Sequence, residues 1–427
     1  MMLRRSGTAL ILLLASARCA TSEDDPVRKV PGGYVDATAE GSGATGGSAG
    51  TGGGAGSGGA AGSEDAGADA SEDAPVDAPI DAPVDALADV VVDVTPDASP
   101  PGTLLLISRN TTSVTLGAWD GSSWSTSPLS LATSSAPALV SGSFGALGVL
   151  RANAQDELTY VSWSAGTWSS AAPVGTAGWT LGTPALASAT SAYLAFIGTD
   201  FKFYSTTYAT SSWTTFAPVT VGANPSFGPA APALAARASE RCLVFEGSDG
   251  DLYSQSWTSG GFQAAYGHGL STHVLGGVTP AIVARDGSNS WVVVYAQMGG
   301  ALMWTQGNQT AWSAPAAVAS GASSTSPVAL LALPGGDVLL AYRGSDDKLH
   351  SSRLSGSSWS APESPYPTTT TTASPSLALG IGSFSAHVAL ISGGGVLVGS
   401  LSGSAWGPTT PVVSNQQQAV AIARVAP

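Results

Sequence analysis

A ten-residue frame recurs seven times in the last three quarters of this chain, and it limits the possible folds more than any other feature. Each copy begins with an apolar residue, and an aromatic residue follows ten positions later. The seven pairs are Val114/Trp124, Leu158/Trp168, Phe203/Trp213, Leu252/Phe262, Leu302/Trp312, Leu349/Trp359 and Val396/Trp406. Successive aromatics lie 44 to 50 residues apart, and self-similarity at such a period indicates a repeat architecture.

A second landmark keeps step with the first. A proline followed by small and branched apolar residues occurs at Pro137, Pro184, Pro232, Pro280, Pro327 and Pro375. A seventh copy would fall near the C-terminus, where residues 419–423 have the same apolar content without the proline. The first frame has no such segment before it, because the array opens at residues 102–106. The extra segment at the C-terminal end could therefore supply the segment that the first repeat lacks.

The pattern inside one repeat predicts four short strands. In the second repeat these are residues 138–140, 147–150, 158–163 and 168 onward, with Gly, Ser, Asn and Asp between them. Four antiparallel strands repeated seven times predict an all-β fold, a seven-bladed β-propeller over residues 103–427. We expect the proline-led strands to line the central channel, the frame aromatics to pack between blades, and residues 419–425 to complete the first blade and close the ring. The alternative is a β-solenoid that does not close.

The first 19 residues predict export. Arg4 and Arg5 precede a short apolar stretch of residues 8–17, too short to span a bilayer. Cleavage after the sequence Ala-Ser-Ala at 15–17 would release a soluble secreted protein. Alternatively, residues 16–19 resemble a bacterial lipobox, in which Cys19 would be acylated. We favour lipidation of Cys19, and hence an outer-membrane or cell-surface lipoprotein attached to the membrane by its N-terminal lipid.

Residues 20–102 predict a disordered tether. A Gly/Ala/Ser-rich half precedes an acidic half in which Asp-Ala-Pro recurs, and the segment holds 16 acidic and 2 basic residues. Such a composition cannot build a core. We expect it to space the propeller from a surface, with an acidic docking or metal-scavenging tail as the alternative.

The charge of the array argues against nucleic-acid binding, and its cysteine content argues against a disulfide. From residue 103 onward there are 13 acidic and 10 basic residues, so the array lacks the basic footprint of a nucleic-acid binder. Cys242 lies in an apolar run, and we expect it to be a buried small hydrophobe rather than a disulfide partner.

The repeat resembles that of a known family. Its consensus combines Pro-Ala-(Leu/Ile)-(Ala/Val), then Gly-Ser-Asp-(Gly/Asp)-x-Leu-(Tyr/His)-Ser, then (Ser/Thr)-x-Trp-(Ser/Thr). It resembles the repeats of bacterial seven-bladed propeller lectins that bind fucose and, more distantly, those of six-bladed fungal fucose lectins. The resemblance covers residues 103–427. It implies shallow sites between adjacent blades, where aromatic faces stack on a sugar and Arg, Glu or Asn side chains bind its hydroxyls.

Two sets of side chains could supply such sites. Five residues after the apolar anchor lie Trp119, Trp163, Tyr208 and Trp257, whereas the later blades carry Gly307, Leu354 and Leu401 there. Near the end of the second strand lie Arg109, Arg151, Glu246 and Arg343. The best candidate sites combine both parts, as in Arg109/Trp119, Arg151/Trp163 and Glu246/Trp257. The alternative is that the aromatics are packing residues and the charged residues serve solubility or turn ion pairs.

The sequence does not indicate an enzyme. Two carboxylates that could share a glycosidase pocket are not marked by any pattern, and we expect no catalytic residue, no cofactor and no metal. The spacing of His268 and His273, five residues apart, is only weak evidence for a metal site. Asp249 and Asp251 fit a hydrogen-bonded turn better than a calcium site.

Two functions remain. The first is an exported carbohydrate-binding, lectin-like propeller whose weak repeated sites bind glycans, with fucose-like sugars as candidates. The second is a non-catalytic protein-interaction or adhesion scaffold of the cell envelope. The first requires the fifth-position aromatics to be exposed beside Arg or Glu, whereas the second would bury them and expose an apolar patch or a charged channel mouth.

Overall fold

The computed structural model describes residues 102–427, apart from 153–155, 176–177, 220–228, 259–260, 264–265, 269–272, 309–310 and 416. The expected signal peptide (residues 1–19), Cys19 and the tether up to residue 101 lie outside the described residues. Within the described part every regular element is a β-strand, and no helix there is long and apolar enough to cross a membrane.

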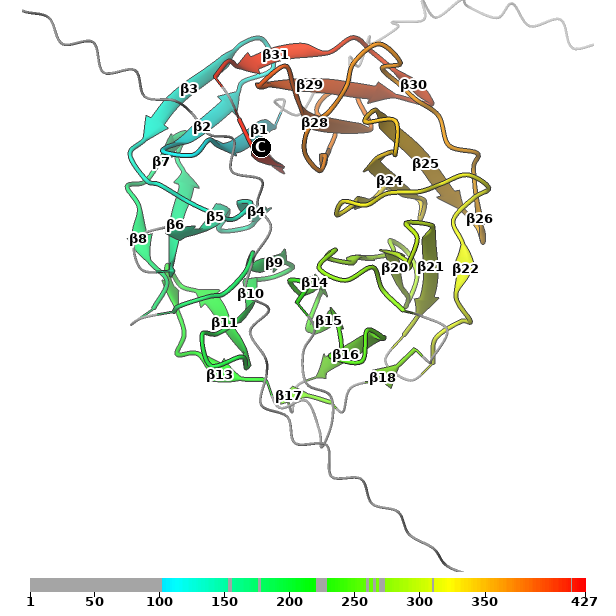
Figure 1. Cartoon of the computed structure of the whole chain (residues 1–427). Helices are drawn as coiled ribbons and strands as arrows, with labels where there is room; N and C mark the ends of the chain where they lie inside the picture. The colour runs from blue at the N-terminus through cyan, green and yellow to red at the C-terminus, as the bar shows by residue number, and fades with distance from the viewer. Residues whose placement is uncertain are drawn as a thin grey trace, which may run out of the picture. The chain divides into compact units, whose positions relative to one another are not determined.

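The strands form seven antiparallel sheets of four or five strands, arranged as blades around a common centre (Figure 1). Blade 1 consists of β32 and β1–β3, blade 2 of β4–β8, blade 3 of β9–β13, blade 4 of β14–β18, blade 5 of β19–β22, blade 6 of β23–β26 and blade 7 of β27–β31. This confirms the predicted seven-bladed propeller.

The innermost strand of each blade is built from small residues. These strands are β4 (Ala138–Gly142), β9 (Ala185–Ser188), β14 (Ala233–Arg237), β19 (Ala281–Ala284), β23 (Ala329–Ala332), β27 (Ser376–Leu379) and β32 (Ala419–Val425). Each contacts the innermost strands of both neighbouring blades, so the seven close a ring. Small side chains allow this approach at the crowded axis, where a cavity of about 530 Å³ remains. The proline-led segments therefore line the channel, as expected.

The second and third strands supply the buried layers. The second strands are β1 (Thr103–Arg109), β5 (Gly145–Ala152), β10 (Ala192–Ile197), β15 (Glu240–Glu246), β20 (Trp291–Ala296), β24 (Val338–Arg343) and β28 (Ala386–Ser392). The third strands are β2 (Val114–Trp119), β6 (Glu157–Ser164), β11 (Phe203–Ala209), β16 (Leu252–Thr258), β21 (Leu302–Gly307), β25 (Leu349–Ser355) and β29 (Gly395–Ser402). All seven apolar anchors of the ten-residue frame lie at the start of the third strands and are buried.

Among the described residues, the outer strand is continuous only in blade 1, as β3 (Trp124–Leu129). Elsewhere it is short: β7 (Thr167–Trp168), β12 (Ser212–Trp213), β17 (Gly261–Phe262), β26 (Ser358–Trp359) and β30 (Ala405–Trp406), with further outer fragments β8 (Ala172–Pro173), β13 (Ala217–Pro218), β18 (Tyr266–Gly267), β22 (Ala316–Ala317) and β31 (Thr410–Val413). In these blades the ladder between the third and outer strands breaks after the frame tryptophan. The hydroxyl oxygen of the Ser or Thr that follows this tryptophan then accepts a hydrogen bond from a backbone N–H of the third strand. Ser169 Oγ accepts from Ser162 N at 2.9 Å, and Ser360 Oγ accepts from Arg353 N at 3.0 Å. This hydrogen bond explains the (Ser/Thr) that follows Trp in the repeat consensus.

The first blade combines both ends of the described chain. Strand β32 pairs along its whole length with β1, from Thr103 opposite Val425 to Arg109 opposite Ala419. The predicted closure is therefore confirmed, and β32 covers the edge that β1 would otherwise present to the channel.

The hydrophobic core is divided among the seven junctions between adjacent blades, with one or two clusters of buried residues at each. Between blades 1 and 2, for example, Ile107 and Leu116 pack with Leu150 and Val161, and Trp168 covers them. The frame aromatics that cover clusters at the other six junctions are Trp124, Trp213, Phe262, Trp312, Trp359 and Trp406. Packing between blades, as expected, is thus the role of the residue at the ten-residue mark.

Cys242 belongs to the cluster between blades 4 and 5 and is fully buried. Burial raises the pKa of its thiol to about 12. It behaves as the small hydrophobe that the sequence predicts.

Candidate functional site

The turns of each blade define two opposite faces of the propeller. The turns between second and third strands, such as residues 110–113, lie on what we call the Arg109 face. The turns between third and fourth strands, such as residues 120–123, lie on the other side, the Trp119 face.

The structure does not bring together the expected pairs of a charged residue and an aromatic residue. Arg109 is opposite Val114 in the β1–β2 ladder, whereas Trp119 is opposite Leu104 at the other end. Five steps along a strand correspond to about 16 Å. The pairs with the same separation are Arg151/Trp163 and Glu246/Trp257. The expectation that each pair forms one site was wrong, because one member lies on the Arg109 face and the other on the Trp119 face.

The basic residues on the Arg109 face hold the connections between blades. Arg109 Nη1 donates to the carbonyl of Thr133 at 3.2 Å and to Gln418 Oε1 at 2.8 Å. Arg151 Nη1 donates to the carbonyl of Leu181 at 2.9 Å. Thr133 and Leu181 both lie in the segment that leads to the next blade, so each arginine fixes the start of its neighbour.

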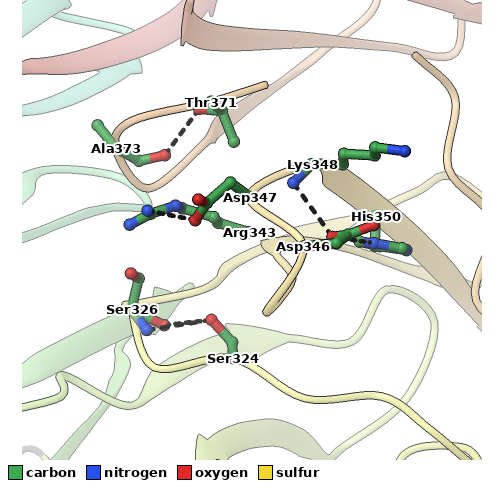
Figure 2. A network of polar contacts seen from close by, with 9 residues as sticks. All are labelled: Ser324, Ser326, Arg343, Asp346, Asp347, Lys348, His350, Thr371 and Ala373. Atoms are coloured by element: carbon green, nitrogen blue, oxygen red, sulfur yellow. Dashed lines mark hydrogen bonds and ion pairs between the residues drawn. The ribbon is translucent and has the colours of Figure 1, made fainter. Parts of the chain in front are cut away.

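Glu246 and Arg343 occupy the same position in blades 4 and 6. Glu246 is buried and accepts from the backbone N–H groups of Ala230 and Gly277, each at 3.3 Å. Burial raises the pKa of Glu246. Arg343 forms an ion pair with Asp347 at 2.5 Å (Figure 2). Both charged groups therefore have partners within the framework on this face.

A row of buried hydroxyls, which was not predicted from the sequence, supports the same connections between blades. Thr371 Oγ1 donates to the carbonyl of Ala373 at 3.0 Å, and Ser324 Oγ donates to that of Ser326 at 2.9 Å (Figure 2). Thr133 and Thr180 make the corresponding bonds in the segments that follow blades 1 and 2. In the sequence, each of these Ser and Thr residues lies three or four positions before a proline landmark, and this spacing could have indicated their role.

The fifth-position aromatics lie on the Trp119 face, opposite the frame aromatics in the ladder. The cross-strand pairs are Trp119/Trp124, Trp163/Trp168, Tyr208/Trp213 and Trp257/Phe262. Tyr208 is buried and the three tryptophans are half-buried. At the same position of blades 6 and 7, Leu354 and Leu401 are buried in the core. Two of the four aromatics line open clefts.

The first cleft lies between blades 7 and 1 and encloses about 440 Å³. Trp119 and Trp124 stack with their ring centroids 6.3 Å apart, and the ring of His387 meets Trp119 edge to face at 5.6 Å. Ser122, Ser400 and other hydroxyl and apolar groups complete the lining.

The imidazole of His387 is neutral in this cleft. Its Nε2 accepts from the backbone N–H of Ile381 at 3.2 Å, so the ring proton is on Nδ1, which lies 2.9 Å from Ser400 Oγ. Burial, together with the charge of Arg424, lowers the pKa of His387 to about 4. The cleft therefore presents aromatic faces and neutral polar groups.

The second cleft lies between blades 2 and 3 and encloses about 720 Å³. Tyr208 forms its aromatic wall, with Tyr160 and Phe144 edge to face against it at 5.9 and 6.2 Å. The remaining lining residues are Ser143, Ser162, Ser164, Thr190, Ser191, Ala209, Thr210 and Ser211. The lining described for this cleft includes no charged side chain.

The equivalent place between blades 3 and 4 is filled by the protein itself. The guanidinium of Arg241 lies 3.7 Å from the ring centroids of both Tyr193 and Trp257. A cation between two aromatic faces is a favourable arrangement. Trp257 therefore already has a partner, and that partner is Arg241 rather than the predicted Glu246.

The Gly-Ser-Asp turns on the Arg109 face are structural. Asp249 Oδ1 accepts from the N–H of Asp251 at 3.1 Å, and its Oδ2 accepts from the Tyr253 hydroxyl at 2.6 Å. Asp200 and Asp346 accept corresponding bonds from Tyr204 and His350. This is the hydrogen-bonded turn expected for Asp249. Within the described residues no group of three or more His, Cys, Asp and Glu could hold a metal ion.

Comparison with known proteins finds the same fold in solved structures. No family model matches the sequence, and no curated protein does so either. The BP39L lectin from Burkholderia pseudomallei is 15% identical, with a TM-score of 0.61 over 74% of this chain and 96% of its own. A triple Arg-to-Ala mutant of AofleA from Arthrobotrys oligospora is 13% identical, with a TM-score of 0.51 over 68% and 90%. The fucose-specific lectin from Aleuria aurantia is 14% identical, with a TM-score of 0.46 over 66% and 96%. At these identities the similarity establishes the propeller fold alone.

Proposed function

We propose that this propeller binds neutral carbohydrates in the two clefts on the Trp119 face, between blades 7 and 1 and between blades 2 and 3. The observation that carries the proposal is the combination, in each cleft, of aromatic rings with many hydroxyl groups and no ionised side chain. A lectin among the solved structures of the same fold supports it, as does the resemblance of the repeat to fucose-binding propeller lectins.

The chemistry of the clefts suits a sugar. The apolar C–H face of a pyranose can lie against Trp119 or Tyr208, while Ser and Thr hydroxyls both donate to and accept from sugar hydroxyls. A carboxylated sugar would lack a cationic partner among the residues that line either cleft. Two weak sites on one face would also gain avidity on clustered glycans.

The test is a glycan array probed with the full chain and with single variants. Trp119→Ala and Tyr208→Ala should each weaken binding to neutral glycans, fucosides among them, by about tenfold, which is about 1.4 kcal/mol. Trp163→Ala is the matched control, because Trp163 holds the same blade position without lining either cleft. Unchanged melting of each variant would exclude unfolding as the cause. A folded parent that binds no glycan, or variants that bind as well as the parent, would contradict the proposal.

A specific observation favours the alternative, a protein-interaction scaffold. The fifth-position aromatics are buried or half-buried, and large apolar side chains are instead exposed on the Arg109 face. Trp179, Leu181 and Phe201 are exposed by 49%, 37% and 69%. If the glycan array shows no binding, this function would be supported by an envelope protein that the parent chain captures and the Phe201→Ser variant does not.

We also propose that the chain is exported and anchored. The support is the sequence of residues 1–19, in which Cys19 follows the apolar stretch, and the low-complexity tether behind it. Labelling with a fatty-acid analogue in a bacterial host should modify the parent and leave Cys19→Ala unlabelled. An unlabelled parent whose mature chain starts at Arg18 would instead identify the Ala-Ser-Ala site.

A further inference from the structure

A separate aromatic pocket lies on the Arg109 face, between blades 2 and 3. It encloses about 230 Å³, less than the roughly 300–1,000 Å³ of sites for drug-sized ligands. Trp179, Phe196, Tyr204 and Phe216 contribute rings to its lining, and Asp200 is the one charged residue among the lining residues. Its size suits a small headgroup.

The rings are held in place by packing. Tyr204 stacks on Phe196 with centroids 5.7 Å apart, and Phe216 meets Phe196 edge to face at 5.2 Å. Trp179 is half exposed and lies in the connection between blades 2 and 3, where it bridges to Glu157. Three rings are therefore positioned before any ligand arrives, and the fourth is accessible.

This combination is not a general property of the repeat. The residues that occupy the position of Trp179 in the connections after blades 5 and 6 are Ser323 and Thr370, as the isolated bridges to Ala301 and Lys348 show. The turn aspartate recurs as Asp346 in blade 6, but Pro362 stands there in place of Phe216. The connections after blades 5 and 6, which the structure describes at this position, therefore lack the aromatic ring that Trp179 contributes to this pocket.

The pocket carries one weakly compensated negative charge. The Asp200 carboxylate accepts from the Tyr204 hydroxyl at 2.9 Å and from the backbone N–H of Lys202 at 3.2 Å. The Lys202 ammonium is 3.5 Å away, but its side chain is 69% exposed. Exposed ion pairs of this kind contribute little, so another cation can compete for the carboxylate.

We propose that this pocket binds a small organic cation of the quaternary ammonium class. Aromatic faces attract such a cation through their quadrupoles, and a carboxylate adds a full opposite charge. A quaternary ammonium needs no hydrogen bonds, which fits a lining whose polar side-chain groups are the Asp200 carboxylate, the hydroxyls of Thr199 and Tyr204 and the Trp179 indole N–H. A sugar would leave several of its hydroxyls without partners here, unlike in the hydroxyl-rich cleft on the opposite face. The proposal does not depend on carbohydrate binding.

The test titrates the full chain with choline at constant ionic strength, followed by calorimetry. Choline should bind at about one site per chain, and at least about fivefold more tightly than its neutral isostere 3,3-dimethyl-1-butanol, since cation–π attraction and the carboxylate require the charge. Trp179→Ala and Asp200→Asn should each weaken choline binding about fivefold or more. Asp346→Asn, which alters the equivalent turn in blade 6, should leave it unchanged.

Three results would overturn the proposal. They are equal affinity for choline and the neutral isostere, unchanged binding by folded Trp179→Ala, and a monosaccharide that binds in a Trp179-dependent manner. Because the sugar clefts are probed by Trp119→Ala and Tyr208→Ala, failure of either proposal is seen independently of the other.

Discussion

The imidazole of His387 in blade 7 meets the indole of Trp119 in blade 1 edge to face, with the ring centroids 5.6 Å apart. The contact joins the blade that ends the array to the blade that begins it. Because Nε2 of the same imidazole accepts a backbone N–H, protonation of the ring would break that bond and place a charge against the wall of the cleft.

Acid should therefore destabilise the protein through His387. Its folded-state pKa of about 4 lies below the unfolded value of 6.5. Between these values the unfolded chain binds a proton that the native state does not, so the free energy of unfolding falls by up to about 1.4 kcal/mol per pH unit as the pH drops. His387→Gln removes this titration. The stability difference between parent and variant, from urea unfolding at pH 7 and pH 4.5, should narrow by about 2–3 kcal/mol, and a constant difference would contradict the assignment.

Arg241 should stabilise the junction of blades 3 and 4. Arg241→Ala removes the guanidinium from between Tyr193 and Trp257 and should cost about 1–3 kcal/mol in denaturant unfolding. Arg241→Lys keeps the charge but cannot stack a planar group on both rings, so it should recover less than half of the loss. Full recovery by lysine would show that charge alone matters.

Gly148 should be sensitive to a single methyl group. A Cβ at this position would overlap Ile107 Cδ1 across the boundary of blades 1 and 2. Gly148→Ala should cost about 1–3 kcal/mol through overpacking, whereas Ile107→Val alone should cost about 0.5–1.5 kcal/mol. In the double variant the shortened side chain leaves room for the methyl group, so the combined loss should be smaller than the sum. Additive losses in urea unfolding would place the strain elsewhere.

Closure by β32 should be essential for the ring. Removal of residues 419–427 exposes the β1 edge and uncovers Leu104 and Leu106, which pack in the cluster shared with blade 7. We expect a chain that aggregates or is rapidly cleaved by protease. Removal of only residues 426–427, which lie beyond the strand, is the control and should leave cooperative unfolding intact. A truncated chain that unfolds like the parent would show that blade 1 is complete without β32.

The fold could be predicted because its signals are local and repeated. Burial at the start of every third strand fixes residues such as Val114 and Leu252, and the frame aromatic covers the gap to the preceding blade. Seven copies make an accidental pattern improbable, and completion of the first blade by residues 419–425 follows from counting strands.

The candidate site could be predicted only in part. Trp119 and Tyr208, which the sequence predicts as candidates, line clefts, but Arg109 and Arg151 were placed beside aromatics that lie on the opposite face. A hairpin drawn from the sequence already separates Arg109, next to the turn, from Trp119 at the far end. The contact of Arg241 with Tyr193 could not be foreseen, because it crosses between blades and depends on how adjacent sheets face one another.

The position of β1 has a mechanical consequence. Any pull on the chain that precedes Thr103 acts on a strand with a ladder on each side, to β2 and to β32. A load along the strand must shear both ladders together, whereas a terminal strand at a sheet edge could be peeled away one bond at a time. A pull at this end of the propeller would thus act on one of the strands of its sheet best able to carry tension.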